Sequence, residues 1–453
     1  MAEQAPAVLV NTPQGLAGRL QREGDYVFTF DPQAGDLTAP ALGMPRRIKP
    51  YVHTSLPPVF QMNLPEGYVL EQLRQRLAKT TGMDPLLLLT VIGSQAPIGR
   101  LRFSAAGAPA LPSAPGERLA DLLASKGSKD LFARLVDTYL MRSGLSGVQP
   151  KVLVPEIGLP LAQPPIAERE RGRSVPRGDG DARDIEPPAY RQRGPAWERP
   201  GTRPEFAASD DGHSAEFKAS LATSELIVKS GLGEFPGLAI NEFFCMSVAR
   251  RAGISVPEFH LSDDGELFVM RRFDRPADGR VLGFEDMLVL AGRDADQKYV
   301  GSYAQALKLL SLYCSPEHWA AAREQLFDMV ALSCILGNGD GHMKNFGVLY
   351  EQVTGAVWMA PAYDIVCTKL YLPDDTLALE LSGNKSFFAA RQGLLDFGHR
   401  CAIPKAKVNA RLLSLAETTL QALDDLAPLV AKLPGLDNVI RQEARRFLET
   451  FRK

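Results

Sequence analysis

The segment Gly337–Asn345, with the sequence GNGDGHMKN, concentrates side chains that could perform chemistry. Asn-Gly-Asp-Gly is an ordinary turn sequence, but a turn does not account for the D-x-x-x-x-N spacing of Asp340 and Asn345, or for Asp364 after a second predicted strand. An aspartate can accept a proton from a hydroxyl group, and Mg²⁺ prefers a few hard oxygen ligands. These side-chain types could therefore supply a general base and ligands for a divalent cation.

Kinase-fold phosphotransferases place an Asp and an Asn at this spacing, with a further metal-binding Asp beyond a short hairpin. Such a site also needs a cation for the phosphates. Lys229 ends the predicted strand Glu225–Lys229 (ELIVK), and Glu242 in the next predicted helix could pair with it. The alternatives are a solvated lysine at a strand end and an acidic residue favoured by the helix dipole.

Upstream, Ser146–Lys151 (SGVQPK) joins a predicted helix to a predicted strand. The chain contains no Walker A sequence. The backbone amides and the lysine of this short loop could nevertheless contact phosphate.

The elements that must position these residues follow an α+β order, strand-rich first and helical later. A serine, a proline and a final glycine predict a helix from Ser315 to Gly337. Periodicity predicts further helices over 68–81, 86–92, 119–141 (weakened at Gly127), 241–252 and 408–423, and strands over 7–10, 26–30, 98–103, 152–154, 225–229, 266–270 and 346–350.

One segment differs in composition from the rest. Residues 155–215 contain ten Pro, nine Arg and eleven Asp or Glu, with very few aliphatic residues. Such a segment cannot bury enough apolar surface to offset the entropy of ordering it. We therefore expect a disordered insertion or linker.

The length, net charge and cysteine content of the whole chain limit the classes of function that it can have. The chain has 453 residues and a formal charge of −2, which argues against a protein that coats nucleic acid through bulk charge. No apolar stretch approaches the roughly 20 residues of a membrane span, and the N-terminus lacks the features of a signal peptide, so a cytoplasmic location is expected. The five cysteines are scattered without C-x-x-C spacing, which predicts buried, reduced thiols.

Together these motifs resemble the HipA family of bacterial toxin kinases, the catalytic half of type II toxin–antitoxin modules. The matching pieces run through most of the chain: Asn63–Glu66 (NLPE), Ile98–Arg100 (IGR), Ser146–Lys151, Glu225–Lys229, Asn241–Phe243 (NEF), Arg272–Arg275 (RFDR), Asp286 with Lys298 and Tyr299, Gly339–Asn345 (GDGHMKN) and Ala362–Ile365 (AYDI). The resemblance implies an α+β, two-lobed protein-kinase-like fold. It implies an N-terminal accessory domain over 1–115, a strand-rich lobe over 116–272 that includes the insertion, and a helical lobe over 273–453.

The resemblance also implies roles for individual residues. Asp340 would be the catalytic base, Asn345 and Asp364 the Mg²⁺ ligands, and Lys229 the phosphate-binding lysine. The other implied ATP contacts are the covering loop Ser146, Gly147, Val148, Gln149, Pro150 and Lys151, the adenine hinge Arg271, Arg272 and Phe273, and the residues His342, Met343, Lys344 and Tyr363. Ser146, with Ser143 as the second choice, would be the residue that is autophosphorylated in that loop.

The implied activity is transfer of the ATP γ-phosphate to Ser or Thr of a protein, by analogy a translation component such as an aminoacyl-tRNA synthetase. The implied partner is a helix-turn-helix antitoxin of the HipB type, through which any contact with DNA would be indirect. Three alternatives stay open: a small-molecule phosphotransferase of kinase fold, an inactive kinase-fold transcriptional co-regulator, and a DNA-binding protein.

Overall fold

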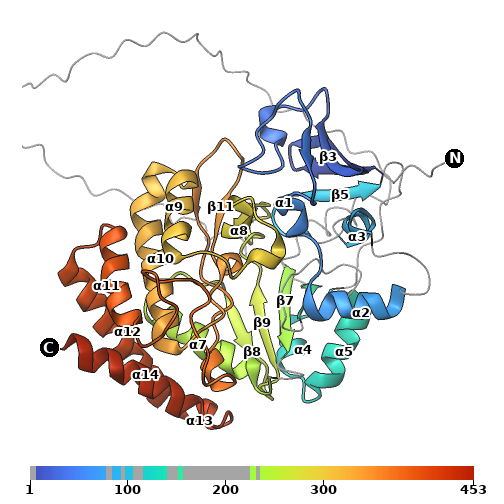
Figure 1. The fold of residues 1–453 in the computed structure, drawn as a ribbon. Coiled ribbons are helices and arrows are strands. Elements are labelled where there is room, and N and C mark those ends of the chain that lie inside the picture. The colour runs from blue at the N-terminus through green and yellow to red at the C-terminus, as the bar shows by residue number, and fades with distance from the viewer. Residues whose placement is uncertain are drawn as a thin grey trace, which may run out of the picture. The chain divides into compact units, whose positions relative to one another are not determined.

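The computed structural model describes residues 7–77, 84–92, 97–105, 116–139, 151–156, 225–230 and 235–452. The N-terminal part forms a five-stranded antiparallel sheet in the order β4-β3-β2-β1-β5. Its strands are β1 (Val8–Thr12), β2 (Gly15–Glu23), β3 (Asp25–Phe30), β4 (Tyr51–His53) and β5 (Arg102–Ala105). Helices α1 (Pro58–Gln61) and α3 (Pro85–Ile92) supply residues to its core, and helix α2 (Gly67–Leu77) follows α1 (Figure 1).

A second antiparallel sheet carries the predicted lysine strand. Its order is β6-β7-β9-β8, with β6 (Lys151–Pro155), β7 (Glu225–Ser230), β8 (Phe259–Leu261) and β9 (Leu267–Arg271). Because side chains alternate along a strand, β9 serves two cores. Leu267 and Val269 pack with α5 (Ser128–Tyr139), while Phe268 and Met270 pack with α7 (Leu238–Arg251).

A third, three-stranded sheet contains the strand that follows the segment Gly339–Asn345. Its order is β10 (Gly283–Asp286), β11 (Gly347–Tyr350) and β12 (Val357–Met359). The remaining helices are α4 (Leu119–Leu123), α8 (Met287–Leu290), α9 (Tyr303–Tyr313), α10 (Pro316–Leu336), α11 (Ala390–Arg400), α12 (Lys405–Asp425), α13 (Ala427–Val430) and α14 (Leu436–Phe451), and the 3₁₀ turns are η1 (Asp36–Thr38), η3 (Ala295–Gln297), η4 (Met343–Asn345) and η5 (Thr368–Leu370). Helices α7, α10, α11, α12 and α14 share one large apolar core (Figure 1).

Most of the predicted elements are confirmed. Helix α10 follows Ser315, has Pro316 at its first position and ends at Gly337 in the left-handed conformation. The helix predicted over 119–141 is interrupted by Gly127 as expected and forms α4 and α5, although its last two residues lie outside the described residues. The strand predicted from Ile98 is wrong at its start, because β5 begins only at Arg102.

The insertion predicted over 155–215 lies almost wholly outside the described residues. At its start, Pro155 still belongs to β6 and Glu156 is buried. The five cysteines are buried and unbonded, which confirms the expectation of reduced thiols. Within the described part of the chain, no helix combines the length and apolar character that a membrane span requires.

Candidate active site

Lys229 lies near the end of β7 and forms the centre of a buried ionic cluster. Its Nζ donates to Glu242 Oε1 of α7 at 2.5 Å and to Asp364 Oδ1, beyond β12, at 2.6 Å. The lysine is 2% exposed and Glu242 is fully buried. Burial alone would lower the pKa of Lys229, but the carboxylates of Asp364 and Glu242 outweigh it and hold the pKa above its ordinary value. The ammonium group therefore remains charged.

Asp364 and Asn345 are held together by two contacts. Asn345 Nδ2 donates to the Asp364 carbonyl oxygen at 3.2 Å, and the hydroxyl of the neighbouring Tyr363 donates to the Lys344 carbonyl oxygen at 2.6 Å. These contacts join η4 to the chain that follows β12, so the intervening β11–β12 hairpin brings the Asn and the Asp together as the sequence predicted. Asp364 has φ +58°, a left-handed conformation that is strained for a residue with a side chain.

Asp340 lies in the turn after α10. Its backbone N–H donates to Asn338 Oδ1 at 3.0 Å, an Asx turn that fixes the loop. Gly339 is required here, since a Cβ atom at this position would lie 2.0 Å from Asp375 Oδ2. The Asp340 side chain is 39% exposed, so it faces the surface while Lys229 and Asn345 are buried.

His342 and Tyr299 flank Asp340. The Tyr299 hydroxyl donates to Asp340 Oδ1 at 2.6 Å, and His342 Nε2 lies 3.7 Å from the same oxygen. Burial first, and then the charge of Lys298, lower the pKa of His342 to about 3. The imidazole is therefore neutral at physiological pH, and Asp364 also acts on it electrostatically, which links Asp340's surroundings to the lysine cluster.

The residues expected at the adenine hinge have other partners in this structure. Arg271 pairs with Glu156 and Glu258, and Arg272 Nη2 lies 2.5 Å from Asp274 Oδ2. Phe273 packs against Phe284 and Tyr363 with ring centroids 5.4 and 5.3 Å apart. Phe273 therefore packs into an aromatic cluster with Phe284 and Tyr363, while the two arginine side chains are engaged in ion pairs.

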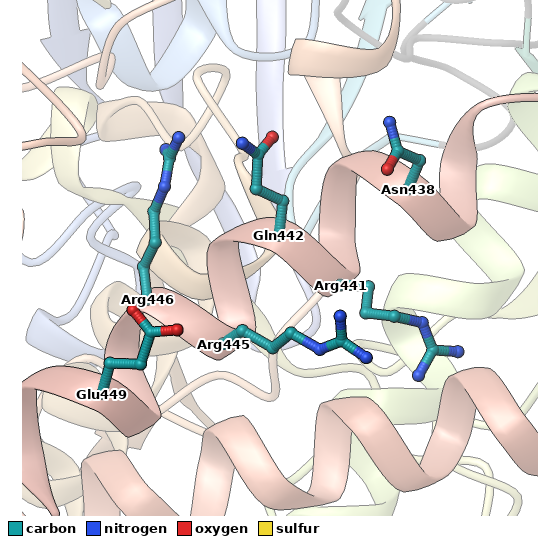
Figure 2. Close-up of a pocket in the computed structure, with 6 residues that line it drawn as sticks. All are labelled: Asn438, Arg441, Gln442, Arg445, Arg446 and Glu449. Atoms are coloured by element: carbon teal, nitrogen blue, oxygen red, sulfur yellow. The ribbon is translucent and has the colours of Figure 1, made fainter.

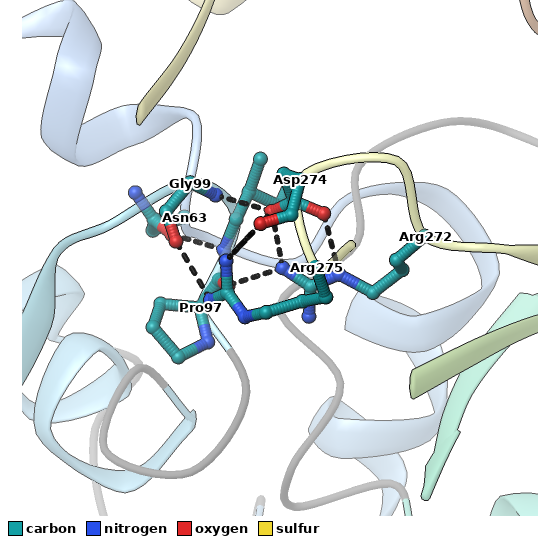
Figure 3. A network of polar contacts seen from close by, with 7 residues as sticks. Asn63, Pro97, Gly99, Arg272, Asp274 and Arg275 are labelled. Atoms are coloured by element: carbon teal, nitrogen blue, oxygen red, sulfur yellow. Dashed lines mark hydrogen bonds and ion pairs between the residues drawn. The ribbon is translucent and has the colours of Figure 1, made fainter. Parts of the chain in front are cut away.

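Asp274 also joins this region to the N-terminal part of the chain, as Figure 3 shows. It accepts from Gly99 N at 2.8 Å and is paired with Arg275, which in turn donates to the Pro97 and Gly99 carbonyl oxygens. Burial would raise the pKa of Asp274, but Arg272 and Arg275 outweigh it and lower the pKa to about 2. The N-terminal motif around Ile98–Arg100 thus contacts the cluster of charged side chains that Asp274 forms with Arg272 and Arg275.

The sequence did not reveal two contacts of the predicted catalytic loop Gly339–Asn345. Lys344 Nζ donates to Glu66 Oε1 at 2.7 Å, and the Tyr299 hydroxyl contacts Asp340. Glu66 and Tyr299 stand in the motifs NLPE and KY, but no local pattern predicts which distant residue each contacts. The covering-loop residues Ser143 and Ser146 to Pro150 lie outside the described residues, and Lys151 begins β6 opposite Lys229.

The residues present fit a magnesium ion. Asn345 Oδ1 is buried and has no hydrogen-bond partner among the described residues, although a buried amide oxygen normally has one. The same residue donates from Nδ2 to the Asp364 carbonyl oxygen, and the Asp364 carboxylate contacts Lys229. One amide oxygen and one carboxylate with added waters match the donors that Mg²⁺ takes in phosphotransfer sites.

A separate shallow depression of about 390 Å³ lies on α14, lined by Asn438, Arg441, Gln442, Arg445, Arg446 and Glu449 (Figure 2). Arg441 is paired with Asp437 and Asp424, and Arg446 with Glu443. None of the predicted site residues contributes to it.

The fold and these contacts define the class of protein: a two-lobed, protein-kinase-like α+β fold with its lysine strand and catalytic-loop residues brought together. The family model for the HipA-like C-terminal domain matches residues 143–423, and that for the HipA N-terminal domain matches residues 8–104. The chain therefore belongs to the HipA family.

Individual relatives agree with this assignment. "Putative kinase Y4dM" of Sinorhizobium fredii is 31% identical over 41% of this chain and 47% of its own length, and "Putative kinase Y4mE" of the same organism is 29% identical over 47% and 52%. The chain thus matches about half the length of these curated relatives. A solved complex of Shewanella oneidensis MR-1 HipA, HipB and operator DNA contains a chain that matches 98% of this one over 95% of its own length, with a TM-score of 0.56 and 18% identity. This likeness confirms the expected fold.

Proposed function

We propose that this protein is a Mg-ATP-dependent serine/threonine protein kinase of the HipA type. The observation that carries the proposal is the contact of buried Lys229 with Asp364, whose backbone is in turn bound by Asn345. A permanently charged ammonium group beside a carboxylate, and a buried amide oxygen with no partner in the described part of the chain, suit a magnesium–triphosphate ligand better than a structural core. Bound Mg²⁺ would neutralise charge on the transferred phosphoryl group.

Each residue then has a distinct task. Lys229 binds phosphate oxygens, with Glu242 fixing its position. Asn345 and Asp364 hold the metal ion, and the surface-facing Asp340 orients the acceptor hydroxyl and takes its proton. His342 stays neutral, so it adds no charge that would neutralise Asp340.

The remaining contacts are proposed from the family. ATP would be covered by Ser146, Gly147, Val148, Gln149, Pro150 and Lys151, and Phe273 with the backbone of Arg271 and Arg272 would lie beside adenine. Met343 is buried in the core and Lys344 is paired with Glu66, so these two side chains stabilise the loop Gly339–Asn345. Ser146, or otherwise Ser143, would be the autophosphorylated residue.

For partners we propose a helix-turn-helix antitoxin of the HipB type and a protein substrate such as an aminoacyl-tRNA synthetase. The solved neighbour was determined as a complex of HipA, HipB and operator DNA, which supports the first of these. DNA would then be contacted through the antitoxin. The accessory domain would span 1–115 and the two lobes 116–272 and 273–453.

The test is incubation of the full chain with γ-³²P-ATP, Mg²⁺ and a bacterial lysate, beside the Asp340→Asn variant. We expect labelled protein bands with the wild type that are absent with the variant, and phosphoserine or phosphothreonine in the bands. Label found only in small molecules would favour a small-molecule phosphotransferase. In a second assay, the wild type and Asp340→Asn are expressed in bacteria and growth is measured. Growth inhibition by the variant equal to that by the wild type would favour an inactive kinase-fold co-regulator.

A further inference from the structure

The hydroxyl of Tyr299 is hydrogen-bonded to one carboxylate oxygen of Asp340, the proposed base. It donates to Asp340 Oδ1 at 2.6 Å, a length typical of a hydroxyl bound to a carboxylate. Burial, and next the charge of Asp340, raise the pKa of Tyr299 above its ordinary value. The phenol therefore remains a donor throughout the physiological range.

The backbone on both sides of this tyrosine is fixed. The Lys298 carbonyl oxygen accepts from Met343 N at 3.2 Å, and the Tyr299 carbonyl oxygen accepts from Lys385 Nζ at 3.2 Å. The ring meets the His342 ring edge-on at a centroid distance of 5.0 Å. The fold thus carries the phenol to Asp340 from a segment 41 residues away.

A protein substrate must make the same contact. For its proton to pass to the base, an acceptor hydroxyl has to lie within about 2.6–3.2 Å of an Asp340 oxygen. The phenol already satisfies this geometry. Tyr299 is 42% exposed, so its side chain lies at the surface, where an incoming substrate can reach and displace it.

We propose that Tyr299 is a placeholder for the acceptor hydroxyl: its phenol binds Asp340 in the free enzyme, limits the access of water to that carboxylate, and gives way to a substrate hydroxyl. This inference rests on the proposed kinase function. It assigns Tyr299 to the acceptor side of the site, as a positioning residue that suppresses transfer of phosphate to water.

The test compares Tyr299→Phe with the wild type in two assays, each with Mg-ATP. The first measures ATP hydrolysis without a protein acceptor, and the second measures phosphate transfer to dephosphorylated casein at a series of casein concentrations. Phe keeps the ring against His342 and removes only the hydroxyl. Tyr51→Phe is the matched control, because it removes a phenol that donates to Pro45 O within the N-terminal part.

We expect Tyr299→Phe to raise acceptor-independent hydrolysis about fivefold and to lower the KM for casein by a similar factor, as the loss of one net hydrogen bond allows, with kcat little changed. Tyr51→Phe should match the wild type in both assays. Unchanged hydrolysis, or a fall in kcat at constant KM, would overturn the placeholder, as would phosphotyrosine at Tyr299 detected by mass spectrometry. If the wild type shows no transfer that depends on Asp340, the proposed function itself fails, which is a separate result.

Discussion

Glu66, from the segment before α2, forms an ion pair with Lys344 of the catalytic loop at 2.7 Å, across 278 residues of sequence. The Lys344 side chain is 9% exposed and that of Glu66 24%. The N-terminal part of the chain therefore contacts the loop that carries Asp340 and Asn345. A change in the N-terminal part of the chain is therefore expected to reach the proposed active site through this pair.

Glu66→Gln should lower both stability and phosphotransfer. Removing one charge from a largely buried pair should reduce the free energy of unfolding by about 1–2 kcal/mol, and a less restrained catalytic loop should reduce kcat. Urea denaturation and a casein assay would measure the two effects. The control is Glu71→Gln, whose contact with Arg74 at 3.9 Å is exposed; equal losses in the two variants would contradict the proposed coupling.

Lys229→Met tests the buried cluster. The substitution leaves the carboxylates of Glu242 and Asp364 without their ammonium group, which should cost about 3–5 kcal/mol of stability. Phosphotransfer should be lost as well.

The double variant Lys229→Met with Glu242→Gln separates the two effects. It should recover part of the stability, because one uncompensated charge is gone, without recovering any activity. Thermal denaturation and the labelled-ATP assay distinguish them. Recovery of activity in the double variant would show that Lys229 has no role toward phosphate.

Asp364 gives a prediction about backbone strain. Its φ of +58° suits glycine, so Asp364→Gly should be more stable than Asp364→Ala by about 1 kcal/mol. Both variants lack the carboxylate and should lose Mg-dependent nucleotide binding equally, as measured by calorimetry. An Ala variant as stable as the Gly variant would argue against a left-handed backbone at this position.

Glu285 makes stability depend on pH. It is fully buried in β10, where burial raises its pKa from 4.5 to about 7 even though Tyr350 and Leu42 N donate to it. The folded state therefore binds a proton that the unfolded state releases between pH 4.5 and 7. Stability should fall as pH rises through this window, by up to about 3 kcal/mol.

Glu285→Gln removes this titration while keeping an oxygen that accepts from Leu42 N and Tyr350. Unfolding free energies measured by urea denaturation between pH 5 and 8 should decline less steeply for the variant than for the wild type. Asp286, whose pKa burial raises to about 6, remains in both proteins and accounts for a residual slope. Parallel slopes in the two proteins would contradict the shifted pKa of Glu285.

The sequence predicted those parts of the site that depend on local spacing. Lys229 ends a predicted strand, Asp340 and Asn345 lie between a predicted helix and a predicted strand, and Asp364 follows a second strand, so chain order indicates that they lie at neighbouring element ends. The contacts of Tyr299 and Glu66 with the catalytic loop could not be predicted, because each joins segments whose spacing carries no periodic signal.

The elements that were not predicted from the sequence include β2 and α14. Strand β2 contains Gly18, which lowers strand propensity, yet a Cβ atom there would lie 2.1 Å from the Thr29 carbonyl oxygen of β3. The close approach of the neighbouring strand therefore requires the glycine. Helix α14 was also not predicted, although Ile440, Ala444 and Phe447 follow the i, i+4, i+7 spacing of an amphipathic helix; it packs against α12 and α10 in the large apolar core.

The most direct test of the central claim is a crystal structure of the full chain with Mg²⁺ and a non-hydrolysable ATP analogue. We predict a magnesium ion about 2.1 Å from Asn345 Oδ1 and from an Asp364 carboxylate oxygen, with Lys229 Nζ on a phosphate oxygen and the γ-phosphate facing Asp340. A nucleotide bound elsewhere, or a metal ion that contacts neither Asn345 nor Asp364, would contradict the account.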